Sequence, residues 1–309
     1  MALTGVLRPG HVQMRVLDLE ESIKFYGDVV GLVETGRDTQ GRVYFKTWDE
    51  RDHNSFIIRQ AETAGLDFYA FKVDSKASLD KFDADLRAYG LKTERIAAGE
   101  LLETGERVRF QIPTGHLIEL YAEKTDVGNG LSYLNPEAWT AQAERGIAPI
   151  RMDHILLYGP DIEAAQKIFE EVLGFYLVEH VELEENKSDL AIWLSCSTKA
   201  HDLAFVRHPE PGKLHHVAFQ LESWEKVLRA ADIMAMNKVN IDIGPTRHGI
   251  TRGTTIYAFD PSGNRIETFC GGYASYPDWQ PIKWTMDEVG RGIFYHDRKL
   301  NDTFLTVVT

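Results

Sequence analysis

Short apolar stretches alternate with amphipathic stretches along the chain. Two regions are alike: HVQMRVLDLEESIKFYGDVVGLVE begins at His11, and HILLYGPDIEAAQKIFEEVLGFYLVE begins at His154. Each starts with an apolar run, passes an acidic turn and continues with apolar residues at the spacing of one helix face. A glycine between apolar residues then opens a further apolar run. We therefore predict a strand, a helix and a second strand in both places.

The likeness belongs to an internal repeat. His53 in HNSFIIR and His201 in HDLAFVR lie 148 positions apart, and so do Pro113 in PTGHLIE and Pro261 in PSGNRIE. A fixed offset over about 60 residues is typical of a duplicated structural unit. The chain is therefore predicted to consist of two similar halves.

Each half divides once more. His154 and His216 both open a strand that leads into a helix, and short runs bounded by Gly, Pro, Asn and Asp follow each helix. A module of this kind cannot bury its sheet face alone, so modules pair. We predict an α+β fold of four βαβββ modules, paired into two similar domains with curved mixed sheets. The predicted boundaries are 1–130 for the first domain, 131–150 for a linker, 151–270 for the second domain and 271–309 for a C-terminal extension.

Composition narrows the possible partners. Lys and Arg total 34 and Asp and Glu total 47, so the formal net charge is −13. This balance argues against binding to nucleic acid or to an anionic membrane surface, because both need clustered cations. No apolar run is long enough to span a membrane, and the first residues do not resemble a secretion signal. With only two cysteines, Cys196 and Cys270, the chain is predicted to be cytoplasmic with reduced thiols.

The repeat also brings candidate metal ligands together. His154 and His216 open equivalent strands of the second half, and Glu267 lies in the last strand, RIETF. Each residue alone is weak evidence, since a lone His is more often structural and a strand-end Glu is more often solvated. Two imidazoles and one carboxylate on three strands nevertheless match the facial triad that holds non-haem Fe(II) and leaves positions open for O₂ and a chelating substrate.

The first half serves as an internal control. His11 corresponds to His154 and Glu119 to Glu267. The position that corresponds to His216 is occupied by Phe68, and phenylalanine cannot bind a metal. We predict one metal per chain, in the second half, with His11 and Glu119 structural. His215, the neighbour of His216, is expected to point to the opposite face of the sheet and receives no role.

These motifs carry a resemblance over nearly the whole chain. MDHILLYG, LSCSTKAHDLAFVRHPE, KLHHVAFQLESWE, IDIGPTRHGIT and TIYAFDPSGNRIETFCGG resemble the catechol 2,3-dioxygenases, extradiol ring-cleavage enzymes of the vicinal oxygen chelate superfamily. The resemblance implies iron ligation by His154, His216 and Glu267, the residues that the repeat also selects. It implies an acid–base role for His201 and pocket roles for His248 and Tyr257.

The resemblance further implies the reaction and the assembly. Catechol would bind Fe(II) through both oxygens, O₂ would take a remaining position, and His201 would supply a proton during ring opening to 2-hydroxymuconic semialdehyde. Members of the family are typically homotetramers, so a homotetramer is expected. For the aromatic-rich C-terminal extension, a strap packed on the domain and a role in oligomer contact or pocket closure are equally open.

Three other functions share part of this pattern. A glyoxalase-type lyase shares the scaffold but uses a different ligand pattern without a ring-cleavage histidine. A binding protein like the bleomycin-sequestering members lacks the metal ligands. An extradiol enzyme for a larger substrate, such as 2,3-dihydroxybiphenyl, differs only in pocket shape and stays open, as does manganese in place of iron.

Overall fold

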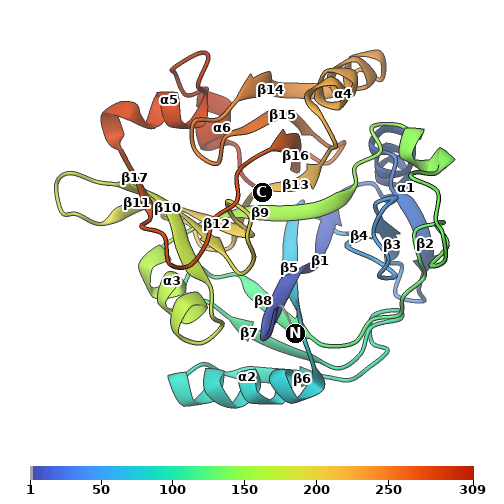
Figure 1. Cartoon of the computed structure of the whole chain (residues 1–309), viewed down its shortest axis with the longest axis horizontal. Helices are drawn as coiled ribbons and strands as arrows, with labels where there is room; N and C mark the ends of the chain where they lie inside the picture. The colour runs from blue at the N-terminus through green and yellow to red at the C-terminus, as the bar shows by residue number, and fades with distance from the viewer. Residues whose placement is uncertain (1–2) are drawn as a thin grey trace.

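Two mixed β-sheets form the body of the computed structural model, which describes residues 3–309 (Figure 1). The first sheet has the order β2-β3-β4-β1-β5-β8-β7-β6, and the second has the order β14-β15-β16-β13-β9-β12-β11-β10-β17. The strands of the first sheet are β1 (Val6–Val16), β2 (Val33–Arg37), β3 (Val43–Lys46), β4 (Phe56–Gln60), β5 (Gly65–Val73), β6 (Thr93–Ile96), β7 (Arg107–Gln111) and β8 (Leu117–Tyr121). Those of the second are β9 (Arg151–Gly159), β10 (Tyr176–Glu182), β11 (Asp189–Ser195), β12 (Leu203–Arg207), β13 (Lys213–Gln220), β14 (Asn240–Arg247), β15 (Gly253–Phe259), β16 (Arg265–Gly271) and β17 (Ile282–Thr285).

The predicted βαβββ module occurs four times. In each module the first strand leads into a helix, and the fourth strand returns parallel to the first: β4 pairs with β1, β8 with β5, β12 with β9 and β16 with β13. The first strands of paired modules, β1 with β5 and β9 with β13, lie antiparallel at the centre of each sheet. The prediction of two similar mixed-sheet halves is therefore confirmed.

The helices lie outside the sheets (Figure 1). The module helices are α1 (Leu19–Lys24), which continues as a π-helix over Phe25–Val30, α2 (Lys76–Tyr89), α3 (Ile162–Glu171) and α4 (Trp224–Met236). Ser75 and Ser223 cap α2 and α4, where each side chain accepts a backbone N–H three residues on. These serines are 148 positions apart, so the repeat preserves the signal that starts the helix.

The two halves share one hydrophobic core. Phe56 of the first half packs against Phe219 of the second, with ring centroids 5.5 Å apart. Buried hydrogen bonds also cross the boundary: the Tyr26 hydroxyl donates to Asp260 at 2.8 Å, and the Tyr69 hydroxyl donates to the backbone carbonyl of Asp202 at 3.0 Å. The first half therefore supports the second, including the segment that carries His201.

The C-terminal extension packs back onto the second sheet. Its elements are β17, a 3₁₀ turn (Met286–Glu288), α5 (Val289–Ile293) and α6 (Asp302–Thr306), and β17 adds to the sheet edge parallel to β10. The last residue, Thr309, exchanges both backbone hydrogen bonds with Leu214 of β13. The extension thus follows β16, reaches the edge of the sheet at β17 and ends beside the central strands. No helix within residues 3–309 combines the length and apolarity needed to span a bilayer.

Candidate metal centre and its pocket

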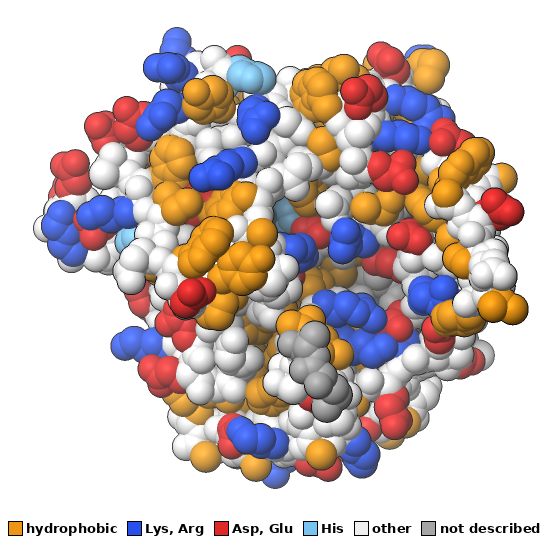
Figure 2. All heavy atoms as spheres, viewed as in Figure 1, with side chains coloured by type: hydrophobic (Ala, Val, Ile, Leu, Met, Phe, Trp, Pro, Cys, Tyr) orange, Lys and Arg blue, Asp and Glu red, His pale blue; other side chains and the backbone are white. Residues whose placement is uncertain are grey.

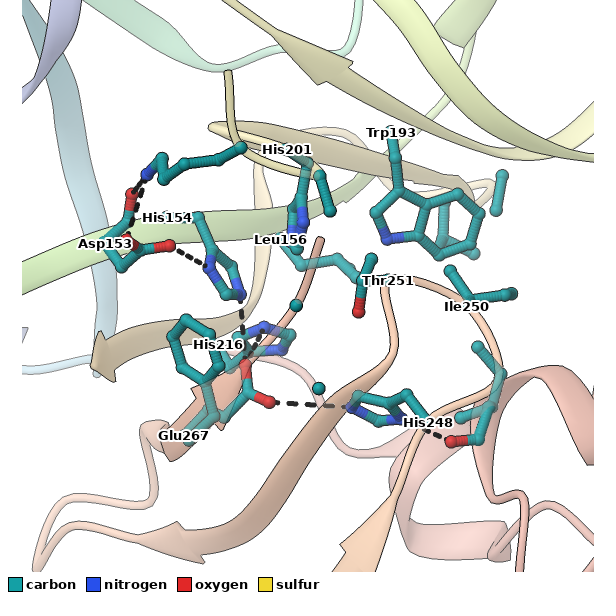
Figure 3. Close-up of a pocket in the computed structure, with 18 of the residues that line it drawn as sticks. Asp153, His154, Leu156, Trp193, His201, His216, His248, Ile250, Thr251 and Glu267 are labelled. Carbon is teal, nitrogen blue, oxygen red and sulfur yellow. Dashed lines mark hydrogen bonds and ion pairs between the residues drawn. The ribbon is translucent and has the colours of Figure 1, made fainter. Parts of the chain in front are cut away.

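Three neighbouring strands bring the predicted ligands together. His154 lies on β9, His216 on β13 and Glu267 on β16, which are adjacent in the sheet, and one ligand atom of each lies within 4.8 Å of the others. Nε2 of His154 lies 3.0 Å and Nε2 of His216 lies 3.3 Å from Oε2 of Glu267 (Figure 3). All three side chains are buried. Among residues 3–309, this is the one group of three such side chains with metal-binding geometry.

The triad fits a divalent metal. Two ligands about 2.1 Å from one ion and at right angles to each other lie about 3 Å apart, which matches the nitrogen–oxygen distances observed here. Nε2 of His216 is buried, and nothing in the described part of the chain hydrogen-bonds to it. A buried nitrogen without a partner is costly unless a ligand satisfies it. Two nitrogens and one carboxylate oxygen suit Fe(II) and leave positions open for other ligands.

Neighbouring polar groups orient the ligands. The Nδ1–H of His154 donates to Asp153 at 2.9 Å, so Nε2 faces Glu267 (Figure 3). Lys199 in turn forms ion pairs with Asp153 at 3.1 Å and with Asp202 at 2.9 Å. The hydroxyl of Thr255 donates to Oε1 of Glu267 at 2.6 Å. Such contacts fix ring orientation and ligand basicity. None of these contacts was predicted from the sequence, although Asp153 lies beside His154 in the same motif.

The charges in this cluster shift the pKa values of its members. Burial lowers the pKa of His216 to about 4, which keeps its imidazole neutral and able to bind a metal. Burial also lowers the pKa of His154, but hydrogen bonds to Asp153 and Glu267 outweigh it and raise that pKa above its ordinary value. Burial raises the pKa of Glu267, but the hydrogen bond from His154 and the nearby imidazoles of His216 and His248 hold that pKa well below the usual range. Glu267 is therefore an anion at neutral pH.

His201 lies directly beside the triad. It precedes β12, and its ring centroid is 3.9 Å from that of His154. Burial and the neighbouring His154 lower the pKa of His201 well below its ordinary value. Its imidazole is therefore neutral at neutral pH and able to accept a proton.

His248 and Tyr257 form a hydrogen-bonded pair on the other side of the triad. The Nδ1–H of His248 donates to the backbone carbonyl of Ile293 in α5, so its Nε2 can accept from the Tyr257 hydroxyl at 2.9 Å. Nε2 of His248 also lies 3.5 Å from Oε1 of Glu267. The structure thus brings all six sequence-predicted residues to one cavity.

The expectation for His215 is wrong. Instead of facing away from His216, its ring contacts that of His216, with the two Nδ1 atoms 2.7 Å apart. The pairing of β13 with β9 shifts register between Leu214 and His216, so strict alternation of side chains breaks down there. Nε2 of His215 lies 2.7 Å from the carbonyl oxygen of Phe304 in α6.

The equivalent place in the first half is filled by cations. Ala70 pairs with His11 on one side and Glu119 on the other, just as Ala218 pairs with His154 and Glu267. There, however, Nζ of Lys124 lies 2.8 Å from Nδ1 of His11. Glu119 forms ion pairs with two arginines, at 2.7 and 2.6 Å. The contacts of His11 and Glu119 agree with the structural role predicted for them.

Acidic and basic side chains are interspersed over the face of the molecule seen in Figure 2, and no basic stripe crosses this face.

A cavity of about 400 Å³ opens over the triad. The cavity walls are largely apolar beyond the triad, and the C-terminal extension contributes to them. The apolar wall residues include Leu156, Val181, Leu190, Trp193, Val206, Ile250, Phe269, Val289, Ile293, Leu300, Phe304 and Leu305.

Two family models and several known proteins match this chain. Residues 66–125 match the catechol 2,3-dioxygenase-like N-terminal domain, and residues 151–268 match the glyoxalase/bleomycin resistance protein/dioxygenase superfamily. The chain is 54% identical to a metapyrocatechase of Pseudomonas sp. (strain CF600), with 99% of each chain covered. It is 31% identical to a manganese-dependent 2,3-dihydroxybiphenyl 1,2-dioxygenase of Geobacillus genomosp. 3, covering 93% of this chain and 92% of the other.

Solved structures of two dioxygenases also resemble this chain. The crystal structure of the 2,3-dioxygenase LapB from Pseudomonas sp. KL28 superposes with a TM-score of 0.91 at 70% identity, covering 92% of this chain and 99% of that one. A substrate complex of homoprotocatechuate 2,3-dioxygenase from Brevibacterium fuscum superposes with a TM-score of 0.87 at 26% identity, covering 98% and 92%.

Proposed function

The chain belongs to the metapyrocatechase family of extradiol dioxygenases, and from that premise we propose that it opens the ring of catechol and small substituted catechols. Both atoms of O₂ enter the product, and the ring is cleaved beside the diol to give 2-hydroxymuconic semialdehyde. Such a reaction serves the degradation of aromatic compounds. The observation that carries the proposal is the buried cluster of two histidines and one glutamate, next to a neutral histidine in an apolar cavity.

We assign His154, His216 and Glu267 as the ligands of Fe(II). When bound, the metal brings the catechol oxygens and O₂ to one place and passes electrons between them. Two neutral imidazoles and one carboxylate leave one positive charge on a divalent ion, which favours an anionic substrate oxygen. The dioxygenase from Geobacillus genomosp. 3 is named as manganese-dependent. A measurement of activity with each metal would therefore decide between iron and manganese in this chain.

We assign His201 as the acid–base residue. Because its imidazole is neutral, it first accepts a proton from a substrate hydroxyl and later returns it to an oxygen of the opening ring. His248 and Tyr257 are assigned to hold the substrate oxygens, since their hydrogen bond places a donor and an acceptor 2.9 Å apart on the cavity wall. The apolar walls exclude water around these groups, which strengthens their hydrogen bonds.

The size of the cavity favours a second, related candidate substrate. A cavity of about 150 Å³ is enough to hold benzene. The cavity here, about 400 Å³, leaves room for a substituent beside the catechol ring. Its walls carry Trp193, Ile250 and Leu305, so apolar substituents fit better than charged ones. Larger diols, such as 2,3-dihydroxybiphenyl, therefore belong in the substrate panel.

Three further assignments belong to this proposal. Residues 1–130 form the non-metal-binding domain, 131–150 the linker and 151–270 the catalytic domain. A homotetramer is proposed from the family resemblance, and the linker exposes large apolar side chains that subunit contacts would cover, Tyr133 at 76%, Leu134 at 77% and Trp139 at 60%. A cytoplasmic location is supported by the two free cysteines.

One experiment tests the reaction. The protein is loaded with Fe(II) without oxygen, catechol is added, and air is then admitted while O₂ uptake and a yellow product are followed. One O₂ consumed per catechol with yellow product is the expected result. Bound iron without product from catechol or any larger diol would overturn the proposed reaction. No bound metal would overturn the triad and make a binding protein the better explanation.

A further inference from the structure

The metal-ligand candidate His216 is linked to the C-terminal helix through His215. The two Nδ1 atoms lie 2.7 Å apart, a hydrogen-bond distance that one proton between them accounts for. On its far side, Nε2 of His215 lies 2.7 Å from the backbone carbonyl oxygen of Phe304. Both imidazoles are buried, at 1% and 2% exposure, so no solvent competes for these contacts.

The chemistry of the groups fixes where the protons lie. A carbonyl oxygen only accepts, so Nε2 of His215 carries a hydrogen. A neutral His215 then has a lone pair on Nδ1, which accepts the Nδ1–H of His216. With its proton on Nδ1, His216 presents a lone pair on Nε2, the atom that faces Glu267. The opposite order of protons would put a hydrogen on that Nε2 and prevent it from binding a metal.

The relay, which is the series of hydrogen bonds from the Phe304 carbonyl through His215 to His216, is held rigidly by its neighbours. The ring of His215 stacks on Tyr158, with centroids 5.0 Å apart and planes at 18°, and it meets the Phe304 ring edge-on at 4.4 Å. Helix α6 is itself fixed by Arg265, which donates to the backbone carbonyls of Thr303 at 2.9 Å and Val307 at 2.8 Å. Arg265 lies on β16, two residues before Glu267. One strand thus carries a ligand and the anchor of α6.

We propose that His215 is a positioning residue for the metal centre. It connects the α6 backbone to His216 by hydrogen bonds on both sides of its ring, and it thereby selects the tautomer of His216 that binds the metal. The inference rests on the proposed function, because it takes His216 as a ligand. Under this proposal, the two histidine ligands donate their Nδ1–H groups to different kinds of acceptor. His154 donates to the carboxylate of Asp153, whereas His216 depends on a neutral imidazole and a carbonyl from the C-terminal extension.

Three substitutions of His215 distinguish a role in hydrogen bonding to His216 from a role in packing alone. In His215→Asn, the amide oxygen is attached to Cγ as Nδ1 is, so it can still accept from His216. In His215→Gln, the longer amide can reach the Phe304 carbonyl, but no acceptor remains at the Nδ1 position. His215→Leu removes both contacts. The matched control is His116→Leu, since His116 is also buried and Nε2 donates to a carbonyl of the same strand, that of Lys213, at 3.0 Å.

The measurement is a titration of the full-length, metal-stripped protein with Co(II), followed by its visible absorption and by the rise in melting temperature. We expect His215→Leu and His215→Gln to weaken Co(II) binding about 10- to 100-fold and to alter the spectrum. We expect His215→Asn to stay within about threefold of the parent protein, because it keeps the acceptor. The control should lower the melting temperature of the stripped protein without changing the dissociation constant for Co(II).

Other outcomes overturn the inference. Equal Co(II) affinity in the parent, Leu and Gln proteins would show that His216 needs no acceptor at Nδ1. Equal losses in the Asn and Gln variants would show a packing effect, and this comparison also decides the question if the Leu variant does not fold. If the parent protein itself binds no Co(II), the proposed triad and the relay fail together. If the parent protein binds Co(II) and cleaves catechol with Fe(II), the proposed function holds whatever the variants show.

Discussion

Lys199 provides a sharp test of the buried charges that support the centre. Its ammonium group forms ion pairs with Asp153 and Asp202, whose side chains are only 4% and 0% exposed. Substitution with Met keeps the aliphatic stem but removes the charge. Asp153 then keeps its hydrogen bond from His154, and Asp202 keeps those from neighbouring serines, but both buried carboxylates lose their cation, which is costly away from water.

The size of the effect follows from burial. Removing one partner of a buried pair costs about 3–5 kcal/mol. The Lys199 side chain is 28% exposed, so water screens part of the interaction and we expect the lower end, about 3 kcal/mol. For a chain of 309 residues, that corresponds to a fall in melting temperature of roughly 4–5 °C.

A second lysine serves as the control. Lys213 is 32% exposed, close to Lys199, but its partner Glu210 is 67% exposed, at 3.4 Å. Lys213→Met should cost less than about 1 kcal/mol, because exposed pairs contribute little. Thermal unfolding of the metal-stripped proteins at pH 7 gives both values. If the two substitutions destabilise the protein equally, burial of the carboxylates does not decide the effect and the reasoning is wrong.

The effect should also depend on pH. Burial raises the pKa of Asp153, but Lys199 and His154 outweigh it and hold that pKa well below its ordinary value of 3.8. The resulting stability is present above pH 3.8 and is lost as the pH falls further. Without Lys199, the carboxyl accepts a proton at higher pH and stops being a buried charge. The difference between Lys199→Met and the parent protein should therefore narrow as the pH falls from 7 towards 4.

Three further predictions follow from the same contacts. His201→Phe should bind Fe(II) as before but lose roughly 10²- to 10⁴-fold in turnover, measured by O₂ uptake, and unchanged turnover would remove His201 from the reaction. For His116, burial lowers the pKa from 6.5 to about 4, so the unfolded chain takes up a proton that the folded chain refuses between these values. The parent protein should lose about 3 kcal/mol more than His116→Gln when the pH falls from 7 to 4, and parallel pH curves in urea unfolding would contradict the assignment. Phe68→His should leave the metal content at one per chain, measured by elemental analysis, because Lys124 holds His11; a second equivalent would disprove this.

The sequence predicted what repetition and alternation encode. The offset of 148 residues matched Glu119 with Glu267, and in the structure these two residues pair with Ala70 and Ala218, which are also 148 positions apart. Alternation failed at His215, because a one-residue register shift leaves no trace in the pattern of apolar residues. Such shifts are decided by tertiary packing, here by the contacts of β13 with β9 and α6.

The contribution of the C-terminal extension was not predictable in the same way. It lies outside the repeat, so no second copy exists for comparison. Its contacts to the centre are also made by backbone carbonyls, those of Ile293 to His248 and Phe304 to His215. A carbonyl is present at every position, so its use as an acceptor cannot be read from residue type. The two histidines are identifiable in the sequence, whereas their acceptors are not.

The two halves show why a metal is needed at the second site. Glu119 and Glu267 occupy equivalent positions and are both buried, at 0% and 2% exposure. In the first half, the guanidinium groups of Arg107 and Arg109 neutralise the carboxylate. The offset of 148 replaces these arginines with Thr255 and Tyr257, which carry no positive charge.

A buried carboxylate still needs a cation, because an isolated charge is expensive to bury. The protonated state of His154 can serve in part, but protonation of Nε2 removes the lone pair that a ligand requires. A divalent ion satisfies Glu267 and both imidazoles at once. The exchange of two arginines for neutral side chains therefore leaves the carboxylate of Glu267 available to a metal ion, and the hydroxyl of Tyr257 lies in the same cavity, 2.9 Å from Nε2 of His248.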